Sequence, residues 1–190
     1  MHRAADCRPR GEENIMMDRH LYITGMEGSG KSSLGKKVAS NLHLRYVDTD
    51  KALISAFGVP IGEIYDHYGI ETFQKAETNL LIWLTRQPPM IISTGGSCVM
   101  NPLNRSIMQA SGMILMVERP LSDILSDIKL DRRPDLEKTG LEGVEKAYHE
   151  RIGLYRSSAD MILDNSRGYY VGVANMERMI RLQFGLYALN

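Results

Sequence analysis

Residues 24–35, TGMEGSGKSSLG, combine glycines, a lysine and a serine at a spacing that suits phosphate binding. Gly25, Gly30, Lys31 and Ser32 match the pattern G-x-x-x-x-G-K-[ST], between an apolar run and an amphipathic stretch. Glycines let backbone N–H groups curl around anionic oxygens, and the amino end of a helix adds its positive dipole. We expect Lys31 to reach the β- and γ-phosphates of a nucleotide and the Ser32 hydroxyl to sit on Mg²⁺. The alternative is a glycine-rich turn that binds nothing.

Two further groups of residues stand where predicted strands end. Asp48 and Asp50 flank Thr49 after one apolar run, at the edge where open α/β sheets bind ligands. One carboxylate could position Mg²⁺ through water, and the other could accept a proton from an attacking hydroxyl. The alternative role of Asp50 is to cap the helix predicted to follow it. Gly95 and Gly96 let the backbone approach a ligand closely, or simply form a tight turn.

The elements that must position these residues alternate between short apolar runs and amphipathic stretches. Continuous apolar runs are typical of parallel strands covered on both faces. Helix starts are indicated by Asn101-Pro102 and by Pro120, and residues 30–42 form an amphipathic helix. The sequence therefore predicts one three-layer α/β/α domain over residues 18–190, with right-handed crossovers. Its predicted strands are 20–25, 45–49, 90–95, 112–118 and 160–164, and its last helix buries Val173, Met176, Ile180, Phe184 and Tyr187.

Two segments fit this core less well. Residues 51–86 form a long, mostly helical insertion between the second and third predicted strands. Residues 129–140, KLDRRPDLEKTG, are charged and contain a proline and a glycine. Elements that close over a ligand usually have this character.

The charge balance argues against nucleic acid and anionic membranes as partners. Lys plus Arg number 23 and Asp plus Glu number 23, so the formal net charge is zero and gives no electrostatic drive toward either. No apolar run approaches the roughly 20 residues that a membrane-spanning helix needs. Cys7 and Cys98 lie in no metal-binding pattern and are expected to be reduced, the alternative being a single disulfide.

The first residues have a composition of their own. Residues 1–16 are polar and contain no apolar stretch of the kind found in secretory signals. We expect translation to begin at Met16 or Met17, with residues 1–17 forming a disordered extension. These features together predict a cytoplasmic protein, taken as a monomer, whose partner is a small molecule.

The order of the motifs resembles the shikimate kinase family. GMEGSGKSSLGKKVAS is followed by DTD, STGG, NR, RRP and ERIGLYRSSAD, from about residue 21 to about residue 166. The resemblance implies a P-loop, nucleoside-monophosphate-kinase-like fold with a five-stranded parallel sheet. It also implies that residues 51–86 bind the substrate and that 129–140 form a mobile lid. The implied reaction moves the γ-phosphoryl group of ATP, with Mg²⁺, to the 3-hydroxyl of shikimate.

The resemblance also implies roles for single residues. Asp48 would lie near the metal, and Asp50 would contact the substrate hydroxyls and act as a base. Arg133 would close on the phosphates and Arg151 would grip the substrate carboxylate, since a guanidinium fork holds either anion at two points. The alternative for both arginines is a surface salt bridge. The implied catalytic residues are Lys31, Asp50 and Arg133; the nucleotide is held by Gly25, Gly28, Gly30, Lys31, Ser32, Ser33 and Arg133, the substrate by Asp50, Gln74, Gly95, Gly96 and Arg151, and the metal by Ser32 and Asp48.

The chain departs from the family pattern on the acceptor side. The family has G-E-x-x-F-R-x-x-E where this chain reads GIETFQKAE, residues 69–77. Ile70 thus replaces an acid, and Gln74 replaces the arginine that forms a second clamp on the carboxylate. Glutamine donates hydrogen bonds without charge, so the loss could weaken binding by several kcal/mol. The other departures are Ser97 at a third glycine, Asp135 in the lid and Ser126 where an arginine often covers the adenine.

Three hypotheses follow. The first is a divergent shikimate kinase, in which Lys31 neutralises the phosphoryl group, Asp50 orients the hydroxyl, Arg133 stabilises charge and Arg151 fixes the carboxylate. The second is a kinase of the same fold acting on another small hydroxylated compound, because Gln74 weakens the demand for a carboxylate. The third is a nucleotide-binding regulatory or interaction module without transfer activity. We favour the first, because a pure binding module needs neither Asp50 nor Arg151.

Overall fold

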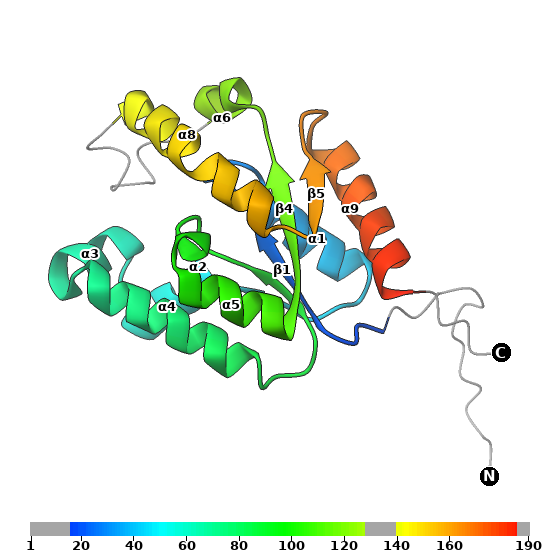
Figure 1. Ribbon diagram of the computed structural model, residues 1–190, viewed down its shortest axis with the longest axis horizontal. Helices are drawn as coiled ribbons and strands as arrows, with labels where there is room; N and C mark the ends of the chain where they lie inside the picture. Colours follow the sequence, from blue (N-terminus) through cyan, green and yellow to red (C-terminus); the bar gives the residue numbers. More distant parts are fainter. Residues whose placement is uncertain (1–15, 128–139, 186–190) are drawn as a thin grey trace, which may run out of the picture.

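A five-stranded parallel sheet forms the centre of the computed structural model, which describes residues 16–127 and 140–185 (Figure 1). Its strand order is β2-β3-β1-β4-β5, and every neighbouring pair is parallel. The predicted parallel sheet is confirmed, and each predicted strand agrees with an observed one to within two residues at either end. The strands are β1 (His20–Thr24), β2 (Tyr46–Asp48), β3 (Ile91–Ser93), β4 (Gly112–Glu118) and β5 (Met161–Asp164).

Helices cover both faces of the sheet, so the predicted three layers are confirmed (Figure 1). Side chains along β1 alternate: Leu21 and Ile23 belong to one apolar core, and Tyr22 belongs to the other. All three are fully buried, as a strand covered on both faces requires. The first core is covered by α1 (Lys31–Asn41) and α9 (Tyr169–Phe184), and the second by α5 (Pro102–Ser111) and α8 (Gly140–Ser158).

The predicted helix starts are also observed. The Asn101 side chain accepts a hydrogen bond from the Leu103 N–H at 3.0 Å and so caps α5, with Pro102 in its first turn. Helix α6 (Leu121–Asp127) begins directly after Pro120. The predicted apolar face of α9 is buried at Val173, Met176, Ile180 and Phe184.

Three helices between β2 and β3 form the predicted insertion, which lies at one end of the molecule (Figure 1). They enclose a small core of their own, made of Leu53, Ile64 and Phe73. The alternative role of Asp50, as the cap of the first of these helices, is wrong: the Asp48 carboxylate accepts from the Lys51 N–H at 3.1 Å. The chain turns into the helix as soon as β2 ends, so the earlier aspartate takes the cap. These helices are α2 (Thr49–Phe57), α3 (Ile61–Tyr68) and α4 (Ile70–Leu84).

Several predictions fall on segments outside the described residues. They include the proposed extension up to residue 15, the lid up to residue 139 with Arg133 and Asp135, and Tyr187. Within the described ranges, no helix is both long and apolar enough to cross a membrane. Cys98 is buried and carries a free thiol, and its possible partner Cys7 lies outside the described residues.

Candidate active site

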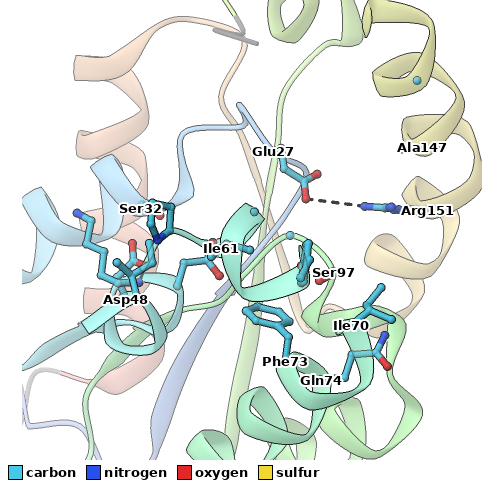
Figure 2. A pocket seen from close by; sticks show the side chains of 18 of the residues that line it. Glu27, Ser32, Asp48, Ile61, Ile70, Phe73, Gln74, Ser97, Ala147 and Arg151 are labelled. Atoms are coloured by element: carbon cyan, nitrogen blue, oxygen red, sulfur yellow. Dashed lines mark hydrogen bonds and ion pairs between the residues drawn. The ribbon is translucent and has the colours of Figure 1, made fainter. Parts of the chain in front are cut away.

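A cavity of about 710 Å³ opens where β1, β2 and β3 end (Figure 2). Its walls come from the loop after β1, the turn after β3, the three helices of the insertion, and α8. Sequence motifs far apart along the chain therefore meet at one place. The predicted site residues that line the cavity are Ser32, Asp48, Asp50, Gln74, Gly96 and Arg151, together with Ser97.

The loop between β1 and α1 has the backbone geometry of an anion site. Gly25, Gly28 and Gly30 have φ angles of 144°, 78° and 94°, which residues with a side chain rarely adopt. The Lys31 side chain folds back over the loop, and its amino group donates to the Met26 carbonyl at 3.2 Å. Lys31 is only 6% exposed, so its charge lies against the loop and not in solvent. A phosphate group placed there would meet both the loop N–H groups and this amino group.

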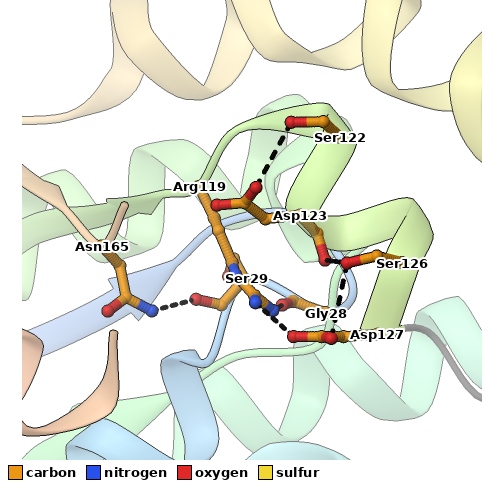
Figure 3. Close-up of polar contacts among 8 residues, drawn as sticks. All are labelled: Gly28, Ser29, Arg119, Ser122, Asp123, Ser126, Asp127 and Asn165. Atoms are coloured by element: carbon orange, nitrogen blue, oxygen red, sulfur yellow. Dashed lines mark hydrogen bonds and ion pairs between the residues drawn. The ribbon is translucent and has the colours of Figure 1, made fainter. Parts of the chain in front are cut away.

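Two side chains hold the loop from its outer side (Figure 3). Arg119, which also forms an ion pair with Asp127, donates to the Gly28 carbonyl at 3.1 Å. The Asn165 amide donates to the Ser29 carbonyl at 2.9 Å. Because a peptide's N–H and C=O point in opposite directions, drawing these carbonyls outward turns the linked N–H groups inward. The loop is thus prepared for an anion before one binds.

The oxygen atoms expected around a metal lie at the same edge of the sheet. The Ser32 hydroxyl is 3.2 Å from the Ser93 hydroxyl at the end of β3, and Asp48 ends β2. No group of three or more acidic, histidine or cysteine side chains in the described part of the chain could form a closed metal site. One hydroxyl and one carboxylate fit Mg²⁺, which takes few protein ligands and keeps water and nucleotide oxygens. Ser33, which was expected to hold the nucleotide rather than the metal, donates to the Gly30 carbonyl at 2.9 Å.

Two carboxylates converge on the turn after β3. A side chain at Gly95 would collide with Asp50 Oδ1 and lie 3.1 Å from Glu77 Oε1, so only glycine lets both approach. The Gly95 N–H donates to the Thr49 hydroxyl at 3.0 Å, which ties this turn to the start of α2. Burial, and then the charge of Asp50, raise the pKa of Glu77 to about 7. Glu77 Oε2 accepts from the Asn104 amide at 3.1 Å, whereas Oε1 has no hydrogen-bond partner in the described residues.

The opposite wall of the cavity carries the groups expected to hold the acceptor. Gln74 comes from α4 and Arg151 from α8 (Figure 2). The Arg151 guanidinium forms an ion pair with Glu27, with 3.8 Å between Nη1 and Oε1. The Tyr155 hydroxyl donates to the Gly96 carbonyl in the turn after β3. Burial, and then the charge of Glu27, raise the pKa of Tyr155, so it stays a neutral donor that fixes the turn.

The sequence analysis gave no role to Glu27 or Glu77, although both are buried in this site. A signal was available for each. Glu27 is an acid inside a loop built for phosphate, where its charge is unfavourable unless it points elsewhere. Glu77 follows Phe73 by four residues and so shares the buried face of α4, where an apolar residue is expected.

Comparisons with known proteins agree with this geometry. A family model described as shikimate kinase matches residues 27–175. A shikimate kinase of Aromatoleum aromaticum is 33% identical over 164 residues, covering 85% of this chain and 94% of the relative. A shikimate kinase of Clostridium beijerinckii is 34% identical over 151 residues, covering 80% and 88%.

The solved structures support the same fold. A shikimate kinase from Acinetobacter baumannii, solved in complex with shikimate, superimposes with a TM-score of 0.81. The match covers 90% of this chain and 96% of that one, at 22% identity. A shikimate kinase from Bacteroides thetaiotaomicron superimposes with a TM-score of 0.77, covering 86% and 97% at 22% identity. The chain belongs to the shikimate kinase family.

Proposed function

We propose that this protein transfers the γ-phosphoryl group of MgATP to the 3-hydroxyl of shikimate. The observation that carries the proposal is a single cavity lined by Ser32 beside the phosphate loop, by Asp50 and by Arg151. The phosphate loop, a base and a carboxylate-binding cation thus face one space. Its volume of about 710 Å³ lies in the range of small-molecule sites. Membership of the family supports the same reaction.

Each residue of the site would have its own role in the reaction. Asp50 would orient the acceptor hydroxyl and accept its proton as the oxygen attacks the phosphorus. Lys31 would stabilise the charge on the phosphoryl oxygens, and Arg151 would hold the acceptor carboxylate. Ser32 and Asp48 would hold Mg²⁺, which when bound neutralises charge on the β- and γ-phosphates.

Gln74 supports a second candidate acceptor. It lines the cavity with a neutral amide, and Arg151, the other expected anchor, already faces Glu27. These two features would weaken the binding of a small hydroxylated compound without a carboxylate less than they weaken the binding of shikimate. Phosphorylation of such a compound, with no turnover of shikimate, is the outcome that would favour this alternative.

ADP release from MgATP, measured with and without millimolar shikimate, tests the proposal. We expect shikimate to stimulate ADP release strongly, and Lys31→Ala to lower the stimulated rate by about 100-fold or more. Lys36→Ala is the matched control, because it removes the same charge from an exposed position of the same helix. Nucleotide binding without stimulation by shikimate would contradict the proposal.

The remaining assignments belong to the same proposal. We expect residues 51–86 to bind the acceptor, 129–140 to act as a lid, and Arg133 to contact the phosphates, as the family resemblance implies. We also expect a cytoplasmic monomer whose partner is a small molecule. Light scattering of the purified full-length chain tests the monomer directly.

A further inference from the structure

Glu27 belongs to the phosphate loop, yet its carboxylate faces the acceptor side of the cavity (Figure 2). Its side chain is 9% exposed, and its Oε1 is 3.8 Å from Nη1 of Arg151. A side chain on Gly96 would collide with the Glu27 carboxylate, so the glycine turn makes room for it. The loop that receives ATP therefore contributes a charge to the acceptor pocket.

The contact between Glu27 and Arg151 is electrostatic rather than a hydrogen bond. A separation of 3.8 Å is too long for an N–H···O bond but lies within ion-pair range. A bound carboxylate that accepts two hydrogen bonds from the guanidinium would be held more strongly. Glu27 can therefore be displaced by an acceptor carboxylate, but its displacement leaves a buried charge without its partner.

We propose that Glu27 is an internal competitor for Arg151, which lowers the preference of the pocket for carboxylate acceptors over neutral ones. The inference rests on the proposed function, because it takes Arg151 as the anchor of the acceptor carboxylate. A carboxylate acceptor must displace Glu27, whereas a neutral polyol leaves the ion pair in place. Because Gln74 is neutral, it provides no second charge to offset the free energy lost when Glu27 is displaced from Arg151.

Glu27→Gln tests the competition, with shikimate and its uncharged methyl ester as paired substrates. The variant keeps the shape of the side chain and removes its charge. We expect the KM for shikimate to fall about fivefold, which corresponds to about 1 kcal/mol, while the KM for the methyl ester stays the same. Calorimetric titration with shikimate should show the same gain in affinity, independent of the chemical step.

Glu150→Gln separates direct pairing from a general effect of pocket charge. Glu150 lines the same cavity, but its carboxylate pairs with Lys146 at 3.9 Å, and within the described residues the ion pair of Arg151 is with Glu27. Removing its charge should lower the KM for shikimate clearly less than Glu27→Gln does. Glu27→Met, neutral and of similar length, repeats the test should the glutamine variant not fold.

Three results would overturn the inference: an unchanged or higher KM for shikimate in Glu27→Gln, an equal fall for the methyl ester, or an equal fall in Glu150→Gln. Failure of the proposed function is seen separately, as a wild-type protein that does not phosphorylate shikimate. Calorimetry still decides the inference in that case. Tighter binding of shikimate by Glu27→Gln than by the wild type supports it, and equal or absent binding in both contradicts it.

Discussion

Glu77→Gln removes a buried carboxyl group. One oxygen of this group, Oε1, has no hydrogen-bond partner among the described residues. Glu77 is 2% exposed, and its carboxyl and that of Asp50 both approach Gly95 in the turn after β3. Glutamine has the same shape, so its carbonyl can keep the hydrogen bond from the Asn104 amide. The amide nitrogen of the glutamine can then take the position of Oε1 and donate a hydrogen bond toward Asp50. The substitution replaces an ionisable group by a neutral one with little change in packing.

The sign of the effect follows from the raised pKa of Glu77. The carboxyl has an ordinary pKa of 4.5, and burial followed by the Asp50 charge raises it to about 7 in the folded protein. Between these pH values the folded protein binds a proton that the unfolded chain has lost, so the free energy of unfolding falls as pH rises. At about 1.4 kcal/mol per pKa unit, this shift in the pKa of Glu77 corresponds to about 3 kcal/mol of folding stability, which is lost by about pH 8.

Urea denaturation of wild type and Glu77→Gln at pH 5 and at pH 8 measures this effect. The stability advantage of the variant over wild type should be about 2–3 kcal/mol larger at pH 8 than at pH 5. Glu71→Gln, an exposed acid in the first turn of the same helix, is the control and should change little at either pH. Equal stability of Glu77→Gln and wild type at both pH values would contradict a raised pKa of Glu77 in the folded protein.

The remaining predictions concern the acceptor site and the packing of α1. Arg151→Ala should raise the KM for shikimate at least about 30-fold in steady-state assays, because the carboxylate loses its charged partner. Gln74→Arg should lower that KM about tenfold by restoring a second charge. Gly35→Ala should cost about 1–3 kcal/mol in urea denaturation, because its Cβ would lie 2.7 Å from Ile23 Cδ1. Gly153→Ala, on an open helix face, should instead stabilise by about 0.5–1 kcal/mol.

Each of these predictions has a contradicting result. An unchanged KM in Arg151→Ala would place the acceptor carboxylate elsewhere. No gain on shikimate in Gln74→Arg would favour a different acceptor. Equal effects of the two glycine substitutions would contradict the close approach of α1 to the sheet.

The sheet and the phosphate loop could be predicted because their signals are local. A strand buried on both faces must be apolar, as in residues 114–117, and no neighbouring element is needed to recognise it. The loop is defined by contiguous residues that end at Lys31 and Ser32. The order of the motifs then indicated the family, which the comparisons confirmed.

The parts of the site that could not be predicted depend on tertiary contacts. Glu27 and Arg151 lie far apart in sequence, and their pairing follows from how α8 crosses the end of the sheet. The raised pKa of Glu77 comes from burial against Asp50 on another helix. The alternative role of Asp50 as the cap of α2 was wrong because Asp48 and Asp50 are equally good caps by sequence, and only the end of β2 decides between them.

The most direct test of phosphoryl transfer to shikimate is ³¹P and ¹H NMR of a reaction containing the purified protein, MgATP and shikimate. We expect one phosphate monoester on the 3-hydroxyl of shikimate for each ADP formed. ADP together with free inorganic phosphate and unmodified shikimate would contradict it, as would a phosphate ester at another hydroxyl.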